Sequence, residues 1–173
     1  MKIDSGAVIK KNRRYSLWRI WNQDLPKILY IMLNPSMANH IEDDSTVRRL
    51  NYFTKKFGFG GFYVGNIYPH ITPFPKVLYS LNLTYSKKNC FYLNSMIEKS
   101  AKIVFAWGNC KEKPLWIENI VKAPLCFGHN KNGSPKHPLY LPKSTRLILI
   151  NLPIFFLKKL KLNFFIILLP LLQ

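Results

Sequence analysis

The chain has 173 residues, of which 48% are hydrophobic and 20% are charged. These values exclude a wholly disordered chain and suit one folded domain with a substantial core. The charge is less ordinary, because 26 Lys and Arg stand against 8 Asp and Glu, a formal net charge of +18. Such an excess favours polyanionic partners, a nucleic acid or a nucleotide among them. A lysine-rich composition imposed by an AT-rich genome is the alternative explanation.

The first third of the chain predicts an antiparallel flap, a buried strand and a helix. Residues 7–21 alternate apolar and polar around a basic turn at Lys10–Arg14. Lys27–Leu33 is continuously apolar, which is typical of a strand buried on both faces. A helix should begin within Glu42–Thr46 and end at Gly58. Its apolar stripe comprises Val47, Leu50, Phe53, Thr54 and Phe57.

Strands and helices alternate through the rest of the chain. The expected strands are Phe62–Val64, Lys102–Trp107 and Leu125–Phe127, and the expected helices are Lys87–Ser100 and Glu112–Val121. The first of these helices should bury Phe91, Met96 and Ile97. This alternation predicts an α/β fold with three α/β/α layers, a four-stranded, mainly parallel sheet and the N-terminal flap.

The domain should span residues 1–143, since the composition changes abruptly afterwards. Residues 144–173 are a hydrophobic and basic extension, either a surface-seeking amphipathic segment or a frame-shifted end. Its apolar runs are shorter than the roughly 20 residues that cross a bilayer, so we expect no integral membrane insertion.

Neither the cysteines nor the acidic residues predict a cofactor. Cys90, Cys110 and Cys126 are odd in number and widely spaced, which argues against disulfides and a zinc site. His40 lies near two aspartates, but no ligand spacing supports a metal site. We expect no metal and no cofactor. The start of the chain lacks a secretory apolar run, which suggests a cytoplasmic protein; the oligomeric state stays open.

Four apolar runs end at short polar, Pro or Gly clusters. The clusters are Asn34-Pro35-Ser36, Gly65–His70, Trp107-Gly108-Asn109 and Gly128-His129. If the runs are parallel strands, these ends share one edge of the sheet. Open α/β sheets bind their ligands at that edge. The sequence therefore predicts a ligand site there.

Eight residues in these clusters or directly next to them are candidates for ligand binding, and each cluster has a structural alternative. They are Leu33, Pro35, Ser36, Asn66, Tyr68, His70, Gly108 and His129. Tyr68 suits base stacking, but packing under the Pro-rich loop 69–76 is its commoner fate. Ser36 lacks the strained turn and the base of a hydrolase nucleophile.

Asn34 and His137 are the candidate catalytic residues. Pro35 forces the chain to turn, so Asn34 should present its amide at the sheet edge, where it can hold a water or read a base. A turn in which Asn34 bonds only its own backbone is the alternative. His137 stands before Pro138 in the polar loop 128–138, and its imidazole can donate a hydrogen bond to a developing anion. A solvated loop is the alternative.

Several motifs together resemble a bacterial and phage family called domain of unknown function 1643. They are Tyr15-Ser16-Leu17, Ile31–Ser36, Asp43–Arg49, Gly65–Tyr68, Ala106-Trp107-Gly108 and His137–Pro142. The resemblance covers about residues 13–143 in order. It implies no activity.

The order of these turns is also similar, more distantly, to the uracil-DNA glycosylase superfamily. That resemblance implies that Asn34 positions the attacking water and that His137 stabilises the departing base as an anion. Ser36 stands where that superfamily has Gly, and no Asp occupies the first turn. The function expected on this basis is an N-glycosylase-like hydrolase or a nucleotide hydrolase. The alternatives are a non-catalytic nucleotide or nucleic-acid binding module, and an enzyme acting on a small metabolite.

Overall fold

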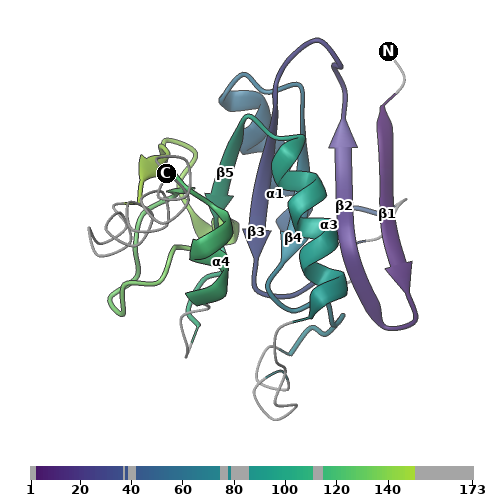
Figure 1. The fold of residues 1–173 in the computed structure, drawn as a ribbon. Coiled ribbons are helices and arrows are strands. Elements are labelled where there is room, and N and C mark those ends of the chain that lie inside the picture. Colours follow the sequence, from purple (N-terminus) through teal and green to yellow (C-terminus); the bar gives the residue numbers. More distant parts are fainter. Residues whose placement is uncertain are drawn as a thin grey trace, which may run out of the picture.

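One mixed sheet of seven strands organises the chain (Figure 1). The computed structural model describes residues 3–36, 38, 42–74, 78, 86–110 and 115–150. The strands are β1 (Asp4–Lys10), β2 (Arg13–Ile20), β3 (Lys27–Met32), β4 (Gly61–Asn66), β5 (Lys102–Phe105), β6 (Leu125–Cys126) and β7 (Ile148–Leu149). The helices are α1 (Ser45–Lys56), α3 (Lys87–Glu98) and α4 (Leu115–Ile120), with a short 3-10 turn η1 (Pro138–Tyr140).

The strand order is β1-β2-β4-β3-β5-β6-β7. The pairs β4–β3, β3–β5 and β5–β6 are parallel, so the carboxyl ends of these four strands meet at one edge, as predicted. The pairs β1–β2, β2–β4 and β6–β7 are antiparallel. The sheet is therefore wider than the predicted four strands, because the N-terminal flap joins it through β2 and because β7 extends it beyond β6.

The central strand β3 is buried on both faces, which explains its continuous apolar sequence. Ile28, Tyr30 and Met32 pack on one face of the sheet, with the apolar stripe of α1. Leu29, Ile31 and Leu33 alternate with them and pack on the opposite face, with α3 and α4. Helices thus cover both faces, and Figure 1 shows α3 and α4 on the near side of the sheet.

A polar side chain caps the start of each of the two longer helices. Asp44 caps α1, where its carboxylate accepts the Val47 N–H, and Ser86 caps α3. Gly58, which follows α1, has a φ of +78° that other residues adopt at a cost.

The prediction that Phe91 is buried is wrong, since its side chain is 70% exposed. The buried face of α3 is formed by Asn89, Cys90, Leu93 and Met96. Phe91 lies beside this face, because the contact with the sheet follows the i, i+3 spacing from Cys90.

The chain after residue 143 contributes to the sheet in part. β7 pairs with β6, although it lies in the segment that the sequence assigned to the extension. A strand of two residues is too short to show the alternation of apolar and polar side chains that predicts a strand. Residues 151–173, the rest of that segment, lie outside the described residues. Within the described part of the chain, no helix is both long and apolar enough to cross a membrane.

Replacing Leu93 tests the packing of α3 on the sheet. Leu93 is fully buried, so Leu93→Ala should lower the free energy of unfolding by about 2–5 kcal/mol, through lost burial and the cavity left behind. Asn94→Ala, at the exposed neighbouring position, is the matched control and should change stability by less than about 0.5 kcal/mol. Urea unfolding measures both; equal effects would contradict this packing.

Candidate functional site

A small cavity of about 150 Å³ opens at the carboxyl ends of β3 and β4. Its apolar walls are Met32, Val47, Leu50, Val64 and Pro73. Its polar side chains are Arg14, Asn34, Ser36, Thr46, Asn66, Thr72 and His137. We call this cavity the rim pocket. It brings together four of the residues predicted from sequence, including Asn34 and His137, which lie 103 positions apart in the numbering of the chain.

Asn34 uses one end of its amide to hold two loops together. Its Nδ2 donates to the carbonyl oxygens of Pro35, at 2.9 Å, and Thr72, at 2.8 Å. The second bond ties the turn after β3 to the loop after β4. Within the described part of the chain, the Oδ1 of Asn34 has no hydrogen-bond partner. This oxygen is therefore available to accept a hydrogen bond from a ligand or a water.

Asn66, the last residue of β4, presents an amide that is buried and unpaired. The residue is 1% exposed, and neither its Oδ1 nor its Nδ2 has a partner among the described residues. Its backbone carbonyl is satisfied, because it accepts a hydrogen bond from Nδ2 of Asn89 at 2.8 Å. An unsatisfied buried amide costs about 1–3 kcal/mol. A ligand that pairs with the Asn66 side chain would recover this cost.

His137 is held in one tautomer at the start of η1. Its Nδ1 accepts the Leu139 N–H at 3.2 Å. Burial lowers the pKa of His137, while the carboxylate of Asp44 opposes the shift. A neutral ring whose Nδ1 accepts must carry its proton on Nε2, so Nε2–H is the donor that the ring offers.

Gly108, which follows β5, lies against the His137 side chain. A Cβ at position 108 would stand 3.1 Å from Cβ of His137, and its φ is +77°. A larger residue would therefore be strained and would push the imidazole aside. Gly108 belongs to the site through this contact rather than by lining the pocket.

Arg14 is the charged residue of the pocket, and the sequence does not predict its place there. It belongs to the predicted basic turn, but it lies in β2 and is 2% exposed. In the pairing with β1, Ser16 faces Val8 and Arg14 faces Ile9, so Tyr15 is an extra, bulged residue. Bulges of this kind redirect side chains near functional sites. No signal in the sequence marks the bulge.

The bulge turns Arg14 away from the side of the sheet that carries α3. Tyr15 stacks on Tyr92 of α3, and Arg14 lines the rim pocket on the opposite side. Its Nη1 donates to the carbonyl of Ala38 at 2.6 Å, whereas Nε has no partner among the described residues. Burial lowers the pKa of Arg14 to about 10, with Asp44 opposing and Arg19 adding to the shift. The guanidinium therefore remains a cation.

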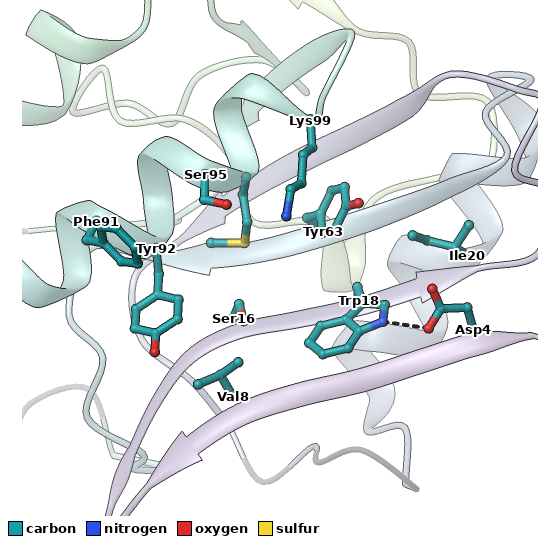
Figure 2. A pocket seen from close by; sticks show the side chains of 11 residues that line it. Asp4, Val8, Ser16, Trp18, Ile20, Tyr63, Phe91, Tyr92, Ser95 and Lys99 are labelled. Atoms are coloured by element: carbon teal, nitrogen blue, oxygen red, sulfur yellow. Dashed lines mark hydrogen bonds between the residues drawn. The ribbon is translucent and has the colours of Figure 1, made fainter.

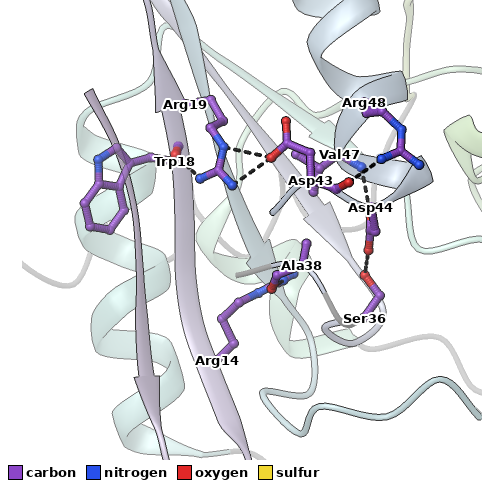
Figure 3. A network of polar contacts seen from close by, with 9 residues as sticks. All are labelled: Arg14, Trp18, Arg19, Ser36, Ala38, Asp43, Asp44, Val47 and Arg48. Atoms are coloured by element: carbon purple, nitrogen blue, oxygen red, sulfur yellow. Dashed lines mark hydrogen bonds and ion pairs between the residues drawn. The ribbon is translucent and has the colours of Figure 1, made fainter. Parts of the chain in front are cut away.

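A polar network fastens the segment before α1 to β2 (Figure 3). Arg19 binds the carboxylate of Asp43 through two nitrogens, the closer at 2.7 Å. Asp44 accepts hydrogen bonds from the Ser36 hydroxyl and, at 2.8 Å, from the Val47 N–H. Both Asp44 oxygens are thus engaged, and the Ser36 hydroxyl is occupied as well. The network holds one wall of the rim pocket in place.

The other predicted ligand-binding residues do not line the rim pocket. Leu33 and Tyr68 pack with the core on the α3 side, and Pro35 is buried. His70 accepts a hydrogen bond from Nε of Arg13 at 3.2 Å. Burial, and to a smaller extent the positive charge of Arg13, lowers the pKa of His70. His129 places Nε2 3.8 Å from Sγ of Cys126.

The described residues contain no group of three metal-ligating side chains. Asp43 and Asp44, the two aspartates close to His40 in the sequence, belong to the polar network. His40 lies outside the described residues.

A family model described as "Protein of unknown function (DUF1643)" matches residues 14–139. The match covers more than half of the chain and includes every residue that lines the rim pocket. The chain belongs to the DUF1643 family. Searches of curated proteins and of solved structures find no match to this DUF1643 chain. The distant resemblance to uracil-DNA glycosylases stays a prediction.

The unpaired amide of Asn66 predicts an unusual effect on the stability of the DUF1643 domain. Asn66→Leu removes two unsatisfied buried atoms at similar volume, so the free energy of unfolding should stay the same or rise, by up to about 3 kcal/mol. Asn89→Leu is the matched control. Asn89 is equally buried, but its Nδ2 donates to the carbonyls of Asn66 and Ile67.

Asn89→Leu should therefore lower the free energy of unfolding by about 1–3 kcal/mol. Thermal and urea unfolding of the ligand-free proteins measure both changes. A loss in Asn66→Leu as large as that in Asn89→Leu would show that the Asn66 amide is a structural group.

The lowered pKa of His137 predicts that acid destabilises the DUF1643 domain. Below about pH 6.5 the unfolded chain binds a proton at this histidine more readily than the folded chain does. The free energy of unfolding should therefore fall as the pH drops from about 7.5 to about 5.5. In His137→Gln the fall should be smaller but not absent, because the pKa of His70 is lowered too. An unchanged pH dependence in the variant would contradict this assignment.

Proposed function

We propose that the DUF1643 domain binds a nucleobase in the rim pocket and hydrolyses the bond between the base and its sugar. The buried amide of Asn66, which has no partner among the described residues and lies between apolar walls, carries this proposal. A base has two apolar faces and a polar edge, and ligand pockets combine apolar walls with a few convergent polar groups. A cavity of about 150 Å³ suits a single ring system, with sugar and phosphate outside.

The polar groups suit the charges that form when such a bond breaks. The electron pair of the carbon–nitrogen bond moves to the base, which leaves as an anion, and the anomeric carbon becomes positive. The Nε2–H of His137, a partly buried ring that lines the pocket, would stabilise the anion. The Oδ1 of Asn34 would accept a hydrogen bond from the water that attacks the anomeric carbon. The attacking water loses its proton and the base gains one.

These roles agree with those that the distant glycosylase resemblance implies for Asn34 and His137. Asn66 adds a base-reading group, since its amide can both donate to and accept from a base edge. The buried cation of Arg14 and the formal net charge of +18 would draw a phosphate-bearing substrate toward the pocket.

A binding module without catalysis is the second candidate, and one observation favours it. No carboxylate lines the rim pocket in the described part of the chain, and both oxygens of Asp44 are engaged. Without a free carboxylate as base, the attacking water is activated only weakly. Such a pocket would hold a base or nucleotide and release it unchanged.

Base release from oligonucleotides and nucleotides tests the proposal. The full-length protein is incubated with single-stranded and duplex oligonucleotides that contain uracil or a mismatched base, and with free nucleotides. Released base is measured by chromatography and strand scission by alkali treatment. Asn34→Ala should abolish release, and His137→Gln should lower it by about 10²- to 10³-fold, as for loss of one positioned donor. His129→Asn, in the same loop but outside the pocket, is the control and should stay active.

Binding separates the two candidates. One possible result is that nucleosides protect the unmodified protein, but not Asn66→Leu, against thermal unfolding while no base is released across the panel. That result would establish the binding module and overturn the catalytic proposal. If nucleosides give no protection and no base is released, both candidate functions are overturned.

A further inference from the structure

A second cavity, of about 380 Å³, lies on the opposite face of the sheet from the rim pocket. It runs between β2, β4 and α3, and aromatic side chains line it (Figure 2). We call it the aromatic groove, defined by Trp18, Tyr63, Phe91, Tyr92 and Lys99. β1, the edge strand of the sheet, contributes Asp4 and Val8 to the lining of the groove (Figure 1). Nothing assigned above makes use of it.

Trp18 is fixed as a flat platform in this groove. It pairs with Gly6 of β1, and a Cβ at position 6 would lie 2.2 Å from the indole. Glycine therefore lets the ring lie across the β1 backbone. The indole Nε1–H donates to the carboxylate of Asp4 at 3.0 Å, which sets the orientation of the ring. A ring held in this way loses little entropy when a ligand stacks on it.

The aromatic surface continues along α3. Tyr92 stacks on Tyr15, with ring centroids 5.1 Å apart, and Phe91 meets Tyr92 edge to face at 5.5 Å. Phe91 is 70% exposed, so most of this large apolar ring is left in water beside the other rings. Its exposure beside two other aromatic rings indicates a contact surface rather than part of the core.

Cations flank the rings at both ends of the groove. Lys99 extends from the end of α3 into the groove on the side of Tyr63 (Figure 2). At the other end, Nζ of Lys88 lies 5.3 Å from the centroid of the Tyr15 ring. Among the described residues that line the groove, Asp4 is the one acidic side chain, and it is engaged with Trp18. The charge of the groove is thus complementary to an anionic backbone.

We propose that the aromatic groove binds single-stranded nucleic acid, whose bases stack on Trp18, Phe91 and Tyr92 and whose phosphates contact Lys99 and Lys88. Stacking platforms between cations are the general device for binding single strands without sequence preference. The groove and the rim pocket lie on opposite faces of the sheet and share no lining residue. The groove can therefore bind a strand whether or not the rim pocket binds a base.

Fluorescence anisotropy with a labelled twelve-nucleotide oligo-dT tests the groove in the full-length protein. The competitors are unlabelled oligo-dT, a twelve-unit backbone of stable abasic residues, and a twelve-residue polyglutamate. Oligo-dT should compete better than either of the others, since they carry negative charge but no bases. Equal competition by the abasic backbone, or by the acidic peptide, would overturn the proposal.

Substitutions in the groove separate stacking from charge. Phe91→Ala should weaken binding by roughly 5- to 100-fold, the range for one lost stacked base, and Phe91→Trp should retain it. Lys99→Gln should make the plot of log affinity against log salt concentration less steep by roughly 0.7, as expected for one lost phosphate contact. Lys122→Gln, the same charge change at an exposed position outside the groove, should leave the slope unchanged. Equal effects of the two lysine variants would overturn the proposal.

Asn66→Leu keeps this result separate from the proposed function. It should bind oligo-dT like the unmodified protein, even if base release fails altogether. Because Phe91 is exposed, Phe91→Ala should also melt at the same temperature as the unmodified protein. Loss of oligo-dT binding in Asn66→Leu, with none in Phe91→Ala, would place the strand in the rim pocket and overturn the groove proposal.

Discussion

Burial of β3 on both faces is the constraint on which the rest of the structure depends. A strand without a polar face must lie inside a sheet and under helices, and β3 pairs with β4 and β5 while α1 and α3 pack on its two faces. Pro35 cannot continue the ladder, so the chain turns beside Asn34. The parallel partner β4 ends beside β3, since its last residue, Asn66, pairs with Met32, the last residue of β3. The side-chain amides of Asn34 and Asn66 therefore reach the same edge of the sheet.

The rim pocket places polar and charged groups next to a largely apolar core. Hydrogen bonds and an ion pair offset the cost of burying these groups. Arg19 and Arg14 are both nearly fully buried, a costly state for a charge without partners. Arg19 has the carboxylate of Asp43, and Arg14 has the Ala38 carbonyl. The amide of Asn66 has no such compensation among the described residues. A ligand or a water in the rim pocket would complete the hydrogen bonds of this amide.

The β-bulge at Tyr15 links the two faces of the sheet. Strict alternation would send Arg14 to the same face as Ser16 and Trp18. The extra residue reverses this, so that Arg14 reaches the rim pocket while Ser16 and Trp18 line the aromatic groove. One strand thus contributes to both cavities. A cation in the pocket and a ring in the groove both depend on one backbone irregularity.

Local sequence was sufficient to predict the parallel strands, α1 with its buried stripe and the edge at which polar turns gather, because periodicity and Pro or Gly breaks act over a few residues. It also identified Asn34, Ser36, Asn66 and His137, each of which lines the rim pocket. The sequence did not determine the burial of Arg14, the exposure of Phe91 or the separate fates of His70 and His129. Each of these depends on how strands pair and on which helix face meets the sheet. Such contacts form between residues far apart in the chain, so only the tertiary structure decided them.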